Sequence, residues 1–341
     1  MDLFAGCGGL TRGFVDTKKY EPVFAVEWDA DAAATYAANF GDHVFVGPIE
    51  QVETFPHADV VVGGPPCQGF SPLNMRGVGL ERRGLWREYL RALRESEARA
   101  FVMENVPELL RSAEYEAFSR AAVRLGFTVE GRILNAADYG VPQTRRRAFV
   151  VGIRDGEPTW PEPTYAAPGK GGRRTRPWRT FRDAVEGLPL APDGKSWHRA
   201  RNPKPKSMER YMTIPKEGEG RFDLAERRPD ITPPCWLRKK TGSTDVFGRL
   251  WWDRPAYTIR TEFYKPEKGR YLHPSEHRPI TVREAARCMG FRDDFVFPED
   301  QPMTSVAKQI GNAVCPPLAS CVARTVAANL SRSGGAVAAA A

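Results

Sequence analysis

A cysteine that follows two prolines at the end of an apolar run occupies a position suited to nucleophilic chemistry. The β-branched run from Ala58 to Gly64 predicts a buried strand, and Pro65-Pro66-Cys67-Gln68-Gly69-Phe70 predicts a stiff turn after it. Ligands of open α/β sheets gather at the carboxyl ends of strands. Because the thiolate is the strong nucleophile, Cys67 would need positive charge or an acid partner nearby. A small, buried and inert cysteine is the alternative that spacing leaves open.

Charged side chains accompany two further predicted strands. Glu104 directly follows one of them, where it could hold a proton or hydrogen-bond a ligand. Gln143, Arg145 and Arg147 precede another strand, and alternate residues of an extended segment share one face. Guanidinium groups there could hold a carbonyl oxygen, a phosphate or a carboxylate. A glutamate in an ordinary turn and a run of surface arginines remain the structural alternatives.

A glycine-rich turn near the start of the chain favours a nucleoside cofactor. The turn runs from Phe4 to Leu10, and Glu27 follows the second predicted strand. Glycines let the backbone approach a ligand, an acid at that place can accept both hydroxyls of a ribose, and the flat side chain of Trp28 could cover an adenine. The glycine spacing fits neither an NTPase phosphate loop nor a regular dinucleotide fingerprint.

The composition indicates an intracellular, metal-free protein with a localised basic segment. The six cysteines form no C-x-x-C pair and the five histidines do not cluster, which argues against structural zinc and disulfides and for a reducing compartment. Neither a signal peptide nor a membrane span is expected, so we predict a cytoplasmic location. Residues 161–250 hold 20 lysines and arginines against 11 aspartates and glutamates, while the formal net charge of the chain is +8. Such an excess suits a polyanion, although a solvated basic surface would look the same.

Alternating strand and helix patterns over residues 2–150 predict an α/β fold with a doubly wound sheet. One predicted helix covers residues 29–40, with Asp29 or Asp31 as its cap, and another covers residues 85–97, with Trp86, Tyr89, Leu90 and Leu93 on one face. The sequence becomes rich in proline, glycine and arginine from residue 158, and a regular helical pattern returns at Thr281. We therefore predict a first domain of residues 1–157 and 281–330, and a second, smaller, irregular, β-containing domain of residues 158–280. Residues 331–341 have mostly small side chains, which predicts a disordered tail.

Six motifs in a fixed order are similar to those of the DNA (cytosine-5) methyltransferases of bacterial type. The resemblance extends from residue 2 to about residue 318, and it implies a mixed, Rossmann-like sheet that binds S-adenosyl-L-methionine. The motifs are Asp2-Leu-Phe-Ala-Gly-Cys-Gly-Gly9, Pro65-Pro-Cys-Gln68, Glu104-Asn-Val106, Gln143-x-Arg-x-Arg147, Arg283-Glu-Ala-Ala-Arg-x-x-Gly-Phe291 and Gln309-Ile-Gly-Asn-Ala-Val314. Gly47-Pro48-Ile49 departs from the Gly-Asp-Ile of many members, so the contact of that aspartate with the adenine amino group has no counterpart here.

The resemblance also implies a role for each site residue, with no metal required. Cys67 would attack carbon 6 of a cytosine flipped out of a duplex, Glu104 would bind ring nitrogen 3 and the exocyclic amine, and Arg145 and Arg147 would hold the base carbonyl and Glu104. The methyl group would then move from the cofactor to carbon 5. Expected cofactor residues are Phe4, Ala5, Gly6, Gly8, Gly9, Leu10, Glu27, Trp28, Ile49, Pro66, Leu85, Asn312 and Val314.

Duplex DNA is the expected partner of a monomeric enzyme, and the basic second domain would recognise its target sequence. A restriction endonuclease is a further expected partner. Two other functions compete. One keeps the chemistry but acts on structured RNA, and the other is a nucleic-acid- or dinucleotide-binding module without catalysis. The large basic segment favours DNA over RNA, and Cys67, Glu104 and Arg145 favour an enzyme over a module.

Overall fold

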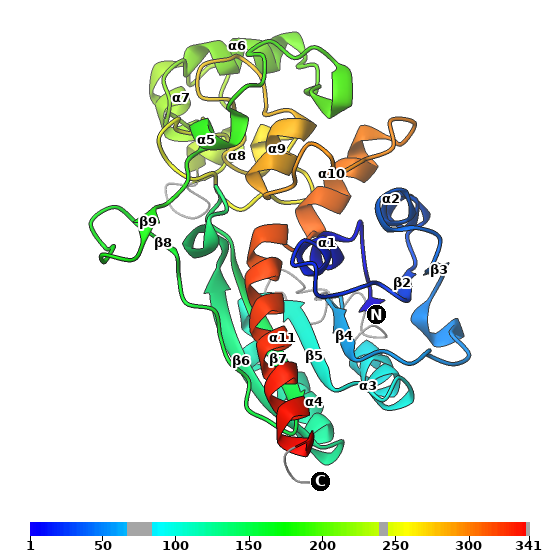
Figure 1. Cartoon of the computed structure of the whole chain (residues 1–341). Coiled ribbons are helices and arrows are strands. Elements are labelled where there is room, and N and C mark those ends of the chain that lie inside the picture. Colours follow the sequence, from blue (N-terminus) through cyan, green and yellow to red (C-terminus); the bar gives the residue numbers. More distant parts are fainter. Residues whose placement is uncertain (67–83, 239–244, 339–341) are drawn as a thin grey trace. The chain divides into compact units, whose positions relative to one another are not determined.

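The chain folds into two compact units, which we describe separately. The computed structural model describes residues 1–66, 84–238 and 245–338, with side chains through Arg332. Unit 1 comprises Met1–Tyr139, Arg146–Thr164 and Ala313–Ala341, and unit 2 comprises Gly140–Arg145 and Tyr165–Asn312 (Figure 1). Cys67 lies outside the described residues, in the gap from residue 67 to residue 83.

Unit 1 is built on a mixed seven-stranded sheet with the strand order β3-β2-β1-β4-β5-β7-β6. Strands β1 to β5 run parallel to one another, whereas β7 is antiparallel to both β5 and β6. The sequence prediction of a doubly wound, mixed α/β sheet is therefore confirmed. The strands are β1 (Asp2–Leu3), β2 (Ala25–Glu27), β3 (Val44–Val46), β4 (Val60–Gly63), β5 (Ala100–Asn105), β6 (Phe127–Asn135) and β7 (Arg146–Arg154).

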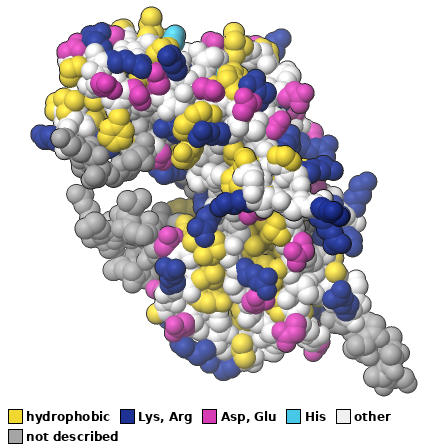
Figure 2. Space-filling model, turned by 90° about the vertical axis from the view of Figure 1, so that its left-hand side faces the viewer, with side chains coloured by type: hydrophobic (Ala, Val, Ile, Leu, Met, Phe, Trp, Pro, Cys, Tyr) yellow, Lys and Arg dark blue, Asp and Glu magenta, His cyan; other side chains and the backbone are white. Residues whose placement is uncertain are grey.

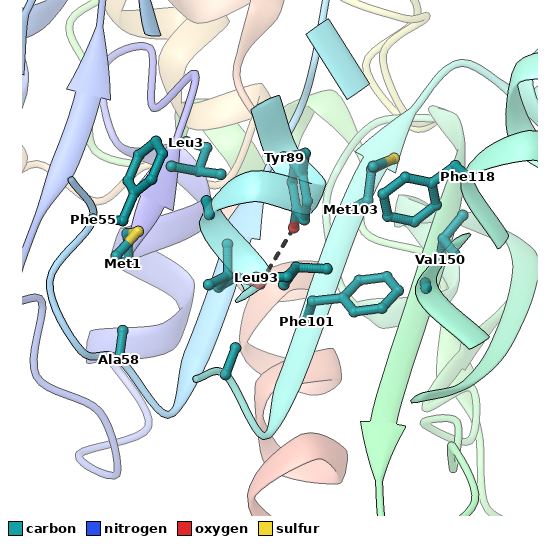
Figure 3. Close-up of a cluster of buried hydrophobic side chains, with 14 of the residues drawn as sticks. Met1, Leu3, Phe55, Ala58, Tyr89, Leu93, Phe101, Met103, Phe118 and Val150 are labelled. Atoms are coloured by element: carbon teal, nitrogen blue, oxygen red, sulfur yellow. Dashed lines mark hydrogen bonds between the residues drawn. The ribbon is translucent and has the colours of Figure 1, made fainter. Parts of the chain in front are cut away.

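Helices cover both faces of this sheet, with α3 and α4 on one face and α1 and α11 on the other (Figures 1 and 3). Helix α2 begins where its sequence predicts, because the Asp29 side chain accepts a hydrogen bond from the Ala32 amide at 3.2 Å. The helices are α1 (Gly9–Val15), α2 (Ala30–Phe40), α3 (Leu85–Glu95), α4 (Ala113–Arg124) and α11 (Pro316–Ala338), with short 3₁₀ turns η1 (Ile49–Gln51), η4 (Pro107–Arg111) and η5 (Ala136–Tyr139).

The core between the sheet and α3 forms around aromatic side chains. Tyr89 and Leu93 of α3 are fully buried, as their helical spacing predicted. Figure 3 shows them against Phe101 of β5, with Phe118 of α4 nearby. The Tyr89 hydroxyl donates hydrogen bonds to backbone carbonyls of β4 and β5, at 3.2 and 3.0 Å. Its polar end is thus satisfied inside the apolar layer that supports the strands.

Short helices make up most of the regular structure in the described part of unit 2. One pair of two-residue parallel strands, β8 (Tyr165–Ala166) and β9 (Arg176–Pro177), supplies its small sheet. Prolines begin several helical segments because they lack the amide that the first turn would leave unpaired. The elements are α5 (Phe181–Val185), η6 (Lys195–Trp197), α6 (Pro205–Thr213), α7 (Arg221–Arg227), α8 (Pro234–Arg238), η7 (Pro266–Lys268), α9 (Val282–Cys288) and α10 (Met303–Asn312).

The unit boundaries differ from the domain boundaries that the sequence predicted. Helices α9 and α10 belong to unit 2, and only α11 returns to unit 1. A buried ion pair fixes α9 within unit 2, because Arg278 donates to both oxygens of Glu284 at 2.8 and 2.9 Å. Helix α11 includes residues 331–338, where the sequence predicted a disordered tail. A helix that is already nucleated can extend through a segment of low helix propensity, because each further residue adds a hydrogen bond without a new nucleation cost.

Stability should depend on the protonation of Asp2, a buried residue of β1. Its carboxylate accepts a hydrogen bond from Thr11 Oγ1 at 2.6 Å, and burial raises its pKa from 3.8 to about 7. Between these values the folded chain binds a proton that the unfolded chain lacks, so this carboxyl lowers the free energy of unfolding as pH rises from about 4 to 7. We expect Asp2→Asn to flatten that decline in chemical denaturation measured across this range. Asp42→Asn, at an exposed position, is the control, and an unchanged pH profile in Asp2→Asn would contradict the assignment.

Candidate active site

The glycine-rich turn after β1 is joined to the end of β2 by the carboxylate of Glu27. Because β1 and β2 are parallel and pair Leu3 with Val26, both strands end at the same edge of the sheet. Glu27 Oε2 accepts a hydrogen bond from the Gly6 amide at 2.7 Å, and Oε1 accepts one from the Asp29 amide at 2.9 Å. Burial raises the pKa of Glu27. Each oxygen has a further lone pair that could accept a ligand hydroxyl.

The backbone of the turn leaves room for a ligand at one glycine and depends on close packing at another. A Cβ built on Gly6 would meet nothing within 4 Å, and its φ is +56°. A Cβ on Gly8, with φ of +88°, would lie 2.3 Å from a ring carbon of Phe40. Gly8 therefore allows α2 to pack against the turn, whereas the backbone at Gly6 faces open space. Phe4 has a positive φ of 58°, and Ala5, Gly9 and Leu10 are buried, which fixes the shape of the turn.

The remaining predicted cofactor residues differ in exposure. The Trp28 side chain is 58% exposed and accessible beside Glu27, whereas Ile49 is 3% exposed and packs in the hydrophobic core. Leu85 begins α3 and is half-buried. Pro66 follows β4, at the same edge of the sheet as the glycine-rich turn. Val314 is buried in unit 1, but Asn312 belongs to unit 2. The structure thus brings the residues after β1, β2 and β4 to one edge, and the cofactor role of every residue stays a prediction.

A buried carboxylate and a guanidinium meet at this same edge. The Oε1 atom of Glu104, a residue of β5, lies 3.1 Å from the Nε atom of Arg147. Both side chains are largely buried. The pairing of β5 with antiparallel β7 produces the contact, because β7 begins where β5 ends. A Cβ on Gly64 would lie 3.4 Å from Glu104 Oε2, so the absence of a side chain at Gly64 leaves space for this carboxylate.

Asn105 is a positioning residue that sequence reasoning did not single out. Its Nδ2 donates a hydrogen bond to the carbonyl of Pro65 at 2.8 Å, and its Oδ1 accepts one from the Val106 amide at 2.8 Å. The side chain is buried and ties the end of β5 to the turn that leads toward Cys67. Its place next to Glu104, in the same motif, was the sequence feature that could have indicated this role.

Arg145 and Arg147 have different surroundings, although the sequence assigned them one joint role. Arg145 is buried in unit 2, where its terminal nitrogens donate to the carbonyls of Ile259 and Gly311 at 2.8 Å each. Gln143 is also buried there and accepts a hydrogen bond from the Ile259 amide at 2.8 Å. Of the two arginines, Arg147 is the one for which the structure shows a contact with Glu104. Whether either arginine holds a base carbonyl stays a prediction.

Burial makes several of the other cysteines poor nucleophiles. The pKa of Cys7 is raised to about 12 by burial, which keeps it a neutral thiol. Cys288 and Cys315 are buried, and burial also raises the pKa of half-buried Cys321. The described residues contain no cluster of three or more metal-ligating side chains and no helix that is long and apolar enough to cross a bilayer.

The sequence profile of the C-5 cytosine-specific DNA methylases matches residues 1–328. The chain belongs to this family. Two relatives agree with the assignment of this chain as a DNA cytosine-5 methyltransferase. Type II methyltransferase M1.HphI of Haemophilus parahaemolyticus is 32% identical over 96% of this chain and 86% of its own length. Type II methyltransferase M.Eco47II of Escherichia coli is 33% identical over 96% of this chain and 78% of its own length.

Solved structures show the same fold at lower sequence identity. A structure described as a DNA modification methyltransferase encoded within an E. coli prophage superimposes with a TM-score of 0.71 at 23% identity, covering 97% of this methyltransferase and 98% of that chain. The Dnmt2 methyltransferase of S. pombe gives a TM-score of 0.66 at 16% identity, covering 97% and 98%. At such identities the likeness supports the fold of the methyltransferase alone.

Substitution of the two arginines should separate catalysis from stability. Arg147→Gln removes the cation beside Glu104, so the pH profile of methyl transfer should shift toward higher pH as Glu104 becomes easier to protonate. Arg145→Gln should lower the free energy of unfolding by about 1–3 kcal/mol for each carbonyl left unpaired. Denaturation curves and pH–rate profiles of both variants test this expectation. Equal stability loss in both variants, with no shift for Arg147→Gln, would contradict it.

Replacement of Glu27 should weaken cofactor binding selectively. Glu27→Ala removes a charged acceptor, worth about 1.5–3 kcal/mol, so the dissociation constant for S-adenosylmethionine should rise by about 10- to 150-fold. Trp28→Ala should also weaken binding, because its exposed ring can no longer stack. Calorimetry with the cofactor is the measurement, and Glu21→Ala, at an exposed position before β2, is the control. Unchanged affinity in both Glu27→Ala and Trp28→Ala would exclude this cofactor site.

Proposed function

We propose that this methyltransferase transfers a methyl group from S-adenosyl-L-methionine to carbon 5 of a cytosine within a specific sequence of duplex DNA. The observation that carries the proposal is the shared edge of the sheet. Glu27 with the Gly6 turn, Pro65-Pro66 before Cys67, and the Glu104–Arg147 pair all lie where the parallel strands of unit 1 end. Ligands of doubly wound sheets bind at that edge.

The residues around the glycine-rich turn fit the proposed cofactor. The carboxylate of Glu27 can accept ribose hydroxyls, Trp28 offers an exposed ring, and Gly6 leaves space above the backbone. When bound, S-adenosylmethionine supplies an electrophilic methyl group. With Pro48 in this chain, no acid at that position contacts the adenine amino group, so Glu27 and Trp28 carry more of the recognition.

Cys67 is the proposed nucleophile. Its thiolate adds to carbon 6 of the cytosine, and electron density then moves to carbon 5, which accepts the methyl group. Loss of the proton from carbon 5 and departure of the Cys67 sulfur restore the aromatic ring. Glu104, as the protonated acid, donates a hydrogen bond to ring nitrogen 3 and accepts one from the exocyclic amine, and Arg147 keeps the Glu104 side chain in place. Arg145 acts through the backbone that it holds in unit 2.

The base must leave the duplex before this chemistry, which costs a few kcal/mol of stacking and pairing. The basic residues between positions 158 and 280 recognise the DNA target, mainly through phosphates. The names of the relatives, type II methyltransferases, suggest a restriction endonuclease as partner. We expect a monomer that acts on the nucleoid in the cytoplasm.

Cys67→Ala should abolish methyl transfer and preserve DNA binding, because it removes only the attacking atom. Wild-type protein should form an adduct that survives denaturation with DNA containing 5-fluorocytosine, since fluorine at carbon 5 blocks the final elimination. Transfer of tritiated methyl groups and denaturing gels measure both effects. Cys235→Ala, at an exposed position in unit 2, is the matched control and should retain activity. Turnover by Cys67→Ala would refute the nucleophile.

Parallel assays on duplex DNA and structured RNA test the substrate. Methylation of RNA and not of DNA would replace the proposed substrate, and no transfer to either would favour a binding module. Bisulfite sequencing of DNA from a host that expresses the chain should then reveal one methylated sequence.

A further inference from the structure

Two arginines and two aromatic rings form a cluster in unit 2 that the proposed mechanism does not use. The cluster consists of Trp251, Arg254, Tyr257 and Arg270. The guanidinium carbons of Arg254 and Arg270 lie 4.6 and 4.4 Å from the centroid of the Trp251 ring, and the Tyr257 ring stacks on it at 6.2 Å with an angle of 26°. Cation–π contacts of this kind hold a guanidinium in a fixed plane.

The inner part of this cluster is fixed by hydrogen bonds and close packing. Arg270 is largely buried and donates to the carbonyls of Gly218 and Arg249 at 2.8 and 2.7 Å. A Cβ on Gly218 would lie 2.3 Å from the Trp251 ring, so this glycine allows the ring to pack on the backbone. Arg254 and Tyr257 form the exposed part. The cluster thus holds its outer arginine on a rigid base.

Arg254 lacks the acidic partner that neighbouring arginines have. Among the residues that the structure describes, no carboxylate oxygen lies within 4.0 Å of its guanidinium. Two acids of the same region form ion pairs with other arginines. Asp253 pairs with Arg182 at 2.7 Å, and Asp245 pairs with Arg260 at 3.2 Å. Burial lowers the pKa of Arg270, and the charge of Arg254 opposes its protonation further. Asp245 and Asp223 offset part of this charge at Arg270, but neither guanidinium forms an ion pair among the described residues, which favours an anion at this place.

The chain segment that carries the cluster is paired with the segment that leads to Arg145. The Ala256 amide donates to the Pro142 carbonyl, and the Ala256 carbonyl accepts from the Thr144 amide, both at 2.9 Å. Arg254 and Tyr257 lie two residues before and one residue after this bridge. Arg145 follows directly on the paired segment. Within unit 2, Arg254 therefore lies on a segment that is hydrogen-bonded to the motif containing Gln143 and Arg145.

Whether a single arginine forms an ion pair matters here, because the surface carries both positive and negative side chains. Figure 2 shows lysine and arginine side chains interspersed with aspartates and glutamates over the face in view. Net charge alone therefore does not identify the arginines that bind a polyanion. An exposed guanidinium that is held in place and lacks a carboxylate meets the requirement better than one in an ion pair.

We propose that the exposed guanidinium of Arg254, held by the Trp251 ring, binds a backbone phosphate of the DNA substrate. This inference rests on the proposed function and adds a specific, sequence-independent contact to it. A planar guanidinium matches two phosphate oxygens, and prior fixation reduces the side-chain entropy lost on binding. The Tyr257 ring supports the site indirectly, because it stacks on the Trp251 ring.

The test compares Arg254→Gln with Arg182→Gln in the full-length protein. Arg182 also lies over a tryptophan ring, that of Trp252 at 5.1 Å, but is paired with Asp253. Fluorescence anisotropy with a mixed-sequence duplex gives the association constant over a range of salt concentrations. Arg254→Gln should weaken binding about tenfold and reduce the slope of log K against log salt by about 0.9, the value for one phosphate. Arg182→Gln and the S-adenosylmethionine affinity of both variants should match the wild type.

Arg254→Lys separates charge from stacking. It should keep the salt slope of the wild type but bind DNA more weakly, because an ammonium is not held in plane by Trp251. An unchanged slope in Arg254→Gln, or an equal loss in Arg182→Gln, would overturn the inference. If the wild type methylates DNA and Arg254→Gln binds as it does, only this inference fails. If the wild type binds no duplex, the proposed function fails with it.

Discussion

A carboxylate that is buried at the end of a strand needs a hydrogen-bond donor or a cation beside it, and this requirement organises the active-site edge of the methyltransferase. Glu27 meets it with the amides of Gly6 and Asp29, which fixes the glycine-rich turn against the end of β2. Glu104 has a charged partner, because it forms an ion pair with the guanidinium of Arg147 at 3.1 Å. The same contacts that satisfy the two acids therefore shape the cofactor turn and orient the carboxylate proposed to bind the base.

The antiparallel strand β7 is what makes the second contact available. A parallel neighbour of β5 would end beside Glu104 and begin at the opposite edge of the sheet. Because β7 runs the other way, its first residues lie beside the last residues of β5, and Asn105 pairs with Ala148. Arg147, one residue earlier, thus comes within reach of Glu104. The mixed topology of the sheet and the chemistry proposed for its edge are consequently linked.

The elements of unit 1 were largely predictable, because apolar runs and caps are local signals. The strand at Val60–Gly63, the Asp29 cap and the buried face of α3 follow from the sequence. Strand β6 was not identified, since it is an edge strand in which half-buried and exposed residues interrupt the apolar pattern. Unit 2 was harder to predict, because its proline- and glycine-rich sequence has weak periodicity. Its short helices also depend on buried contacts between distant residues, such as the hydrogen bond from the Trp197 indole to the carbonyl of Phe297.

The separate surroundings of Arg145 and Arg147 show where sequence reasoning stops. A period of two places both on one face of an extended segment, and from spacing alone they are equivalent. The chain, however, passes from unit 2 to unit 1 between Arg145 and Arg146, so each arginine finds its partners in a different unit. Net charge has the same limit. It identified the basic segment, but only the contacts of single side chains distinguish an arginine in an ion pair, such as Arg182, from one that still lacks a carboxylate among the described residues, such as Arg254.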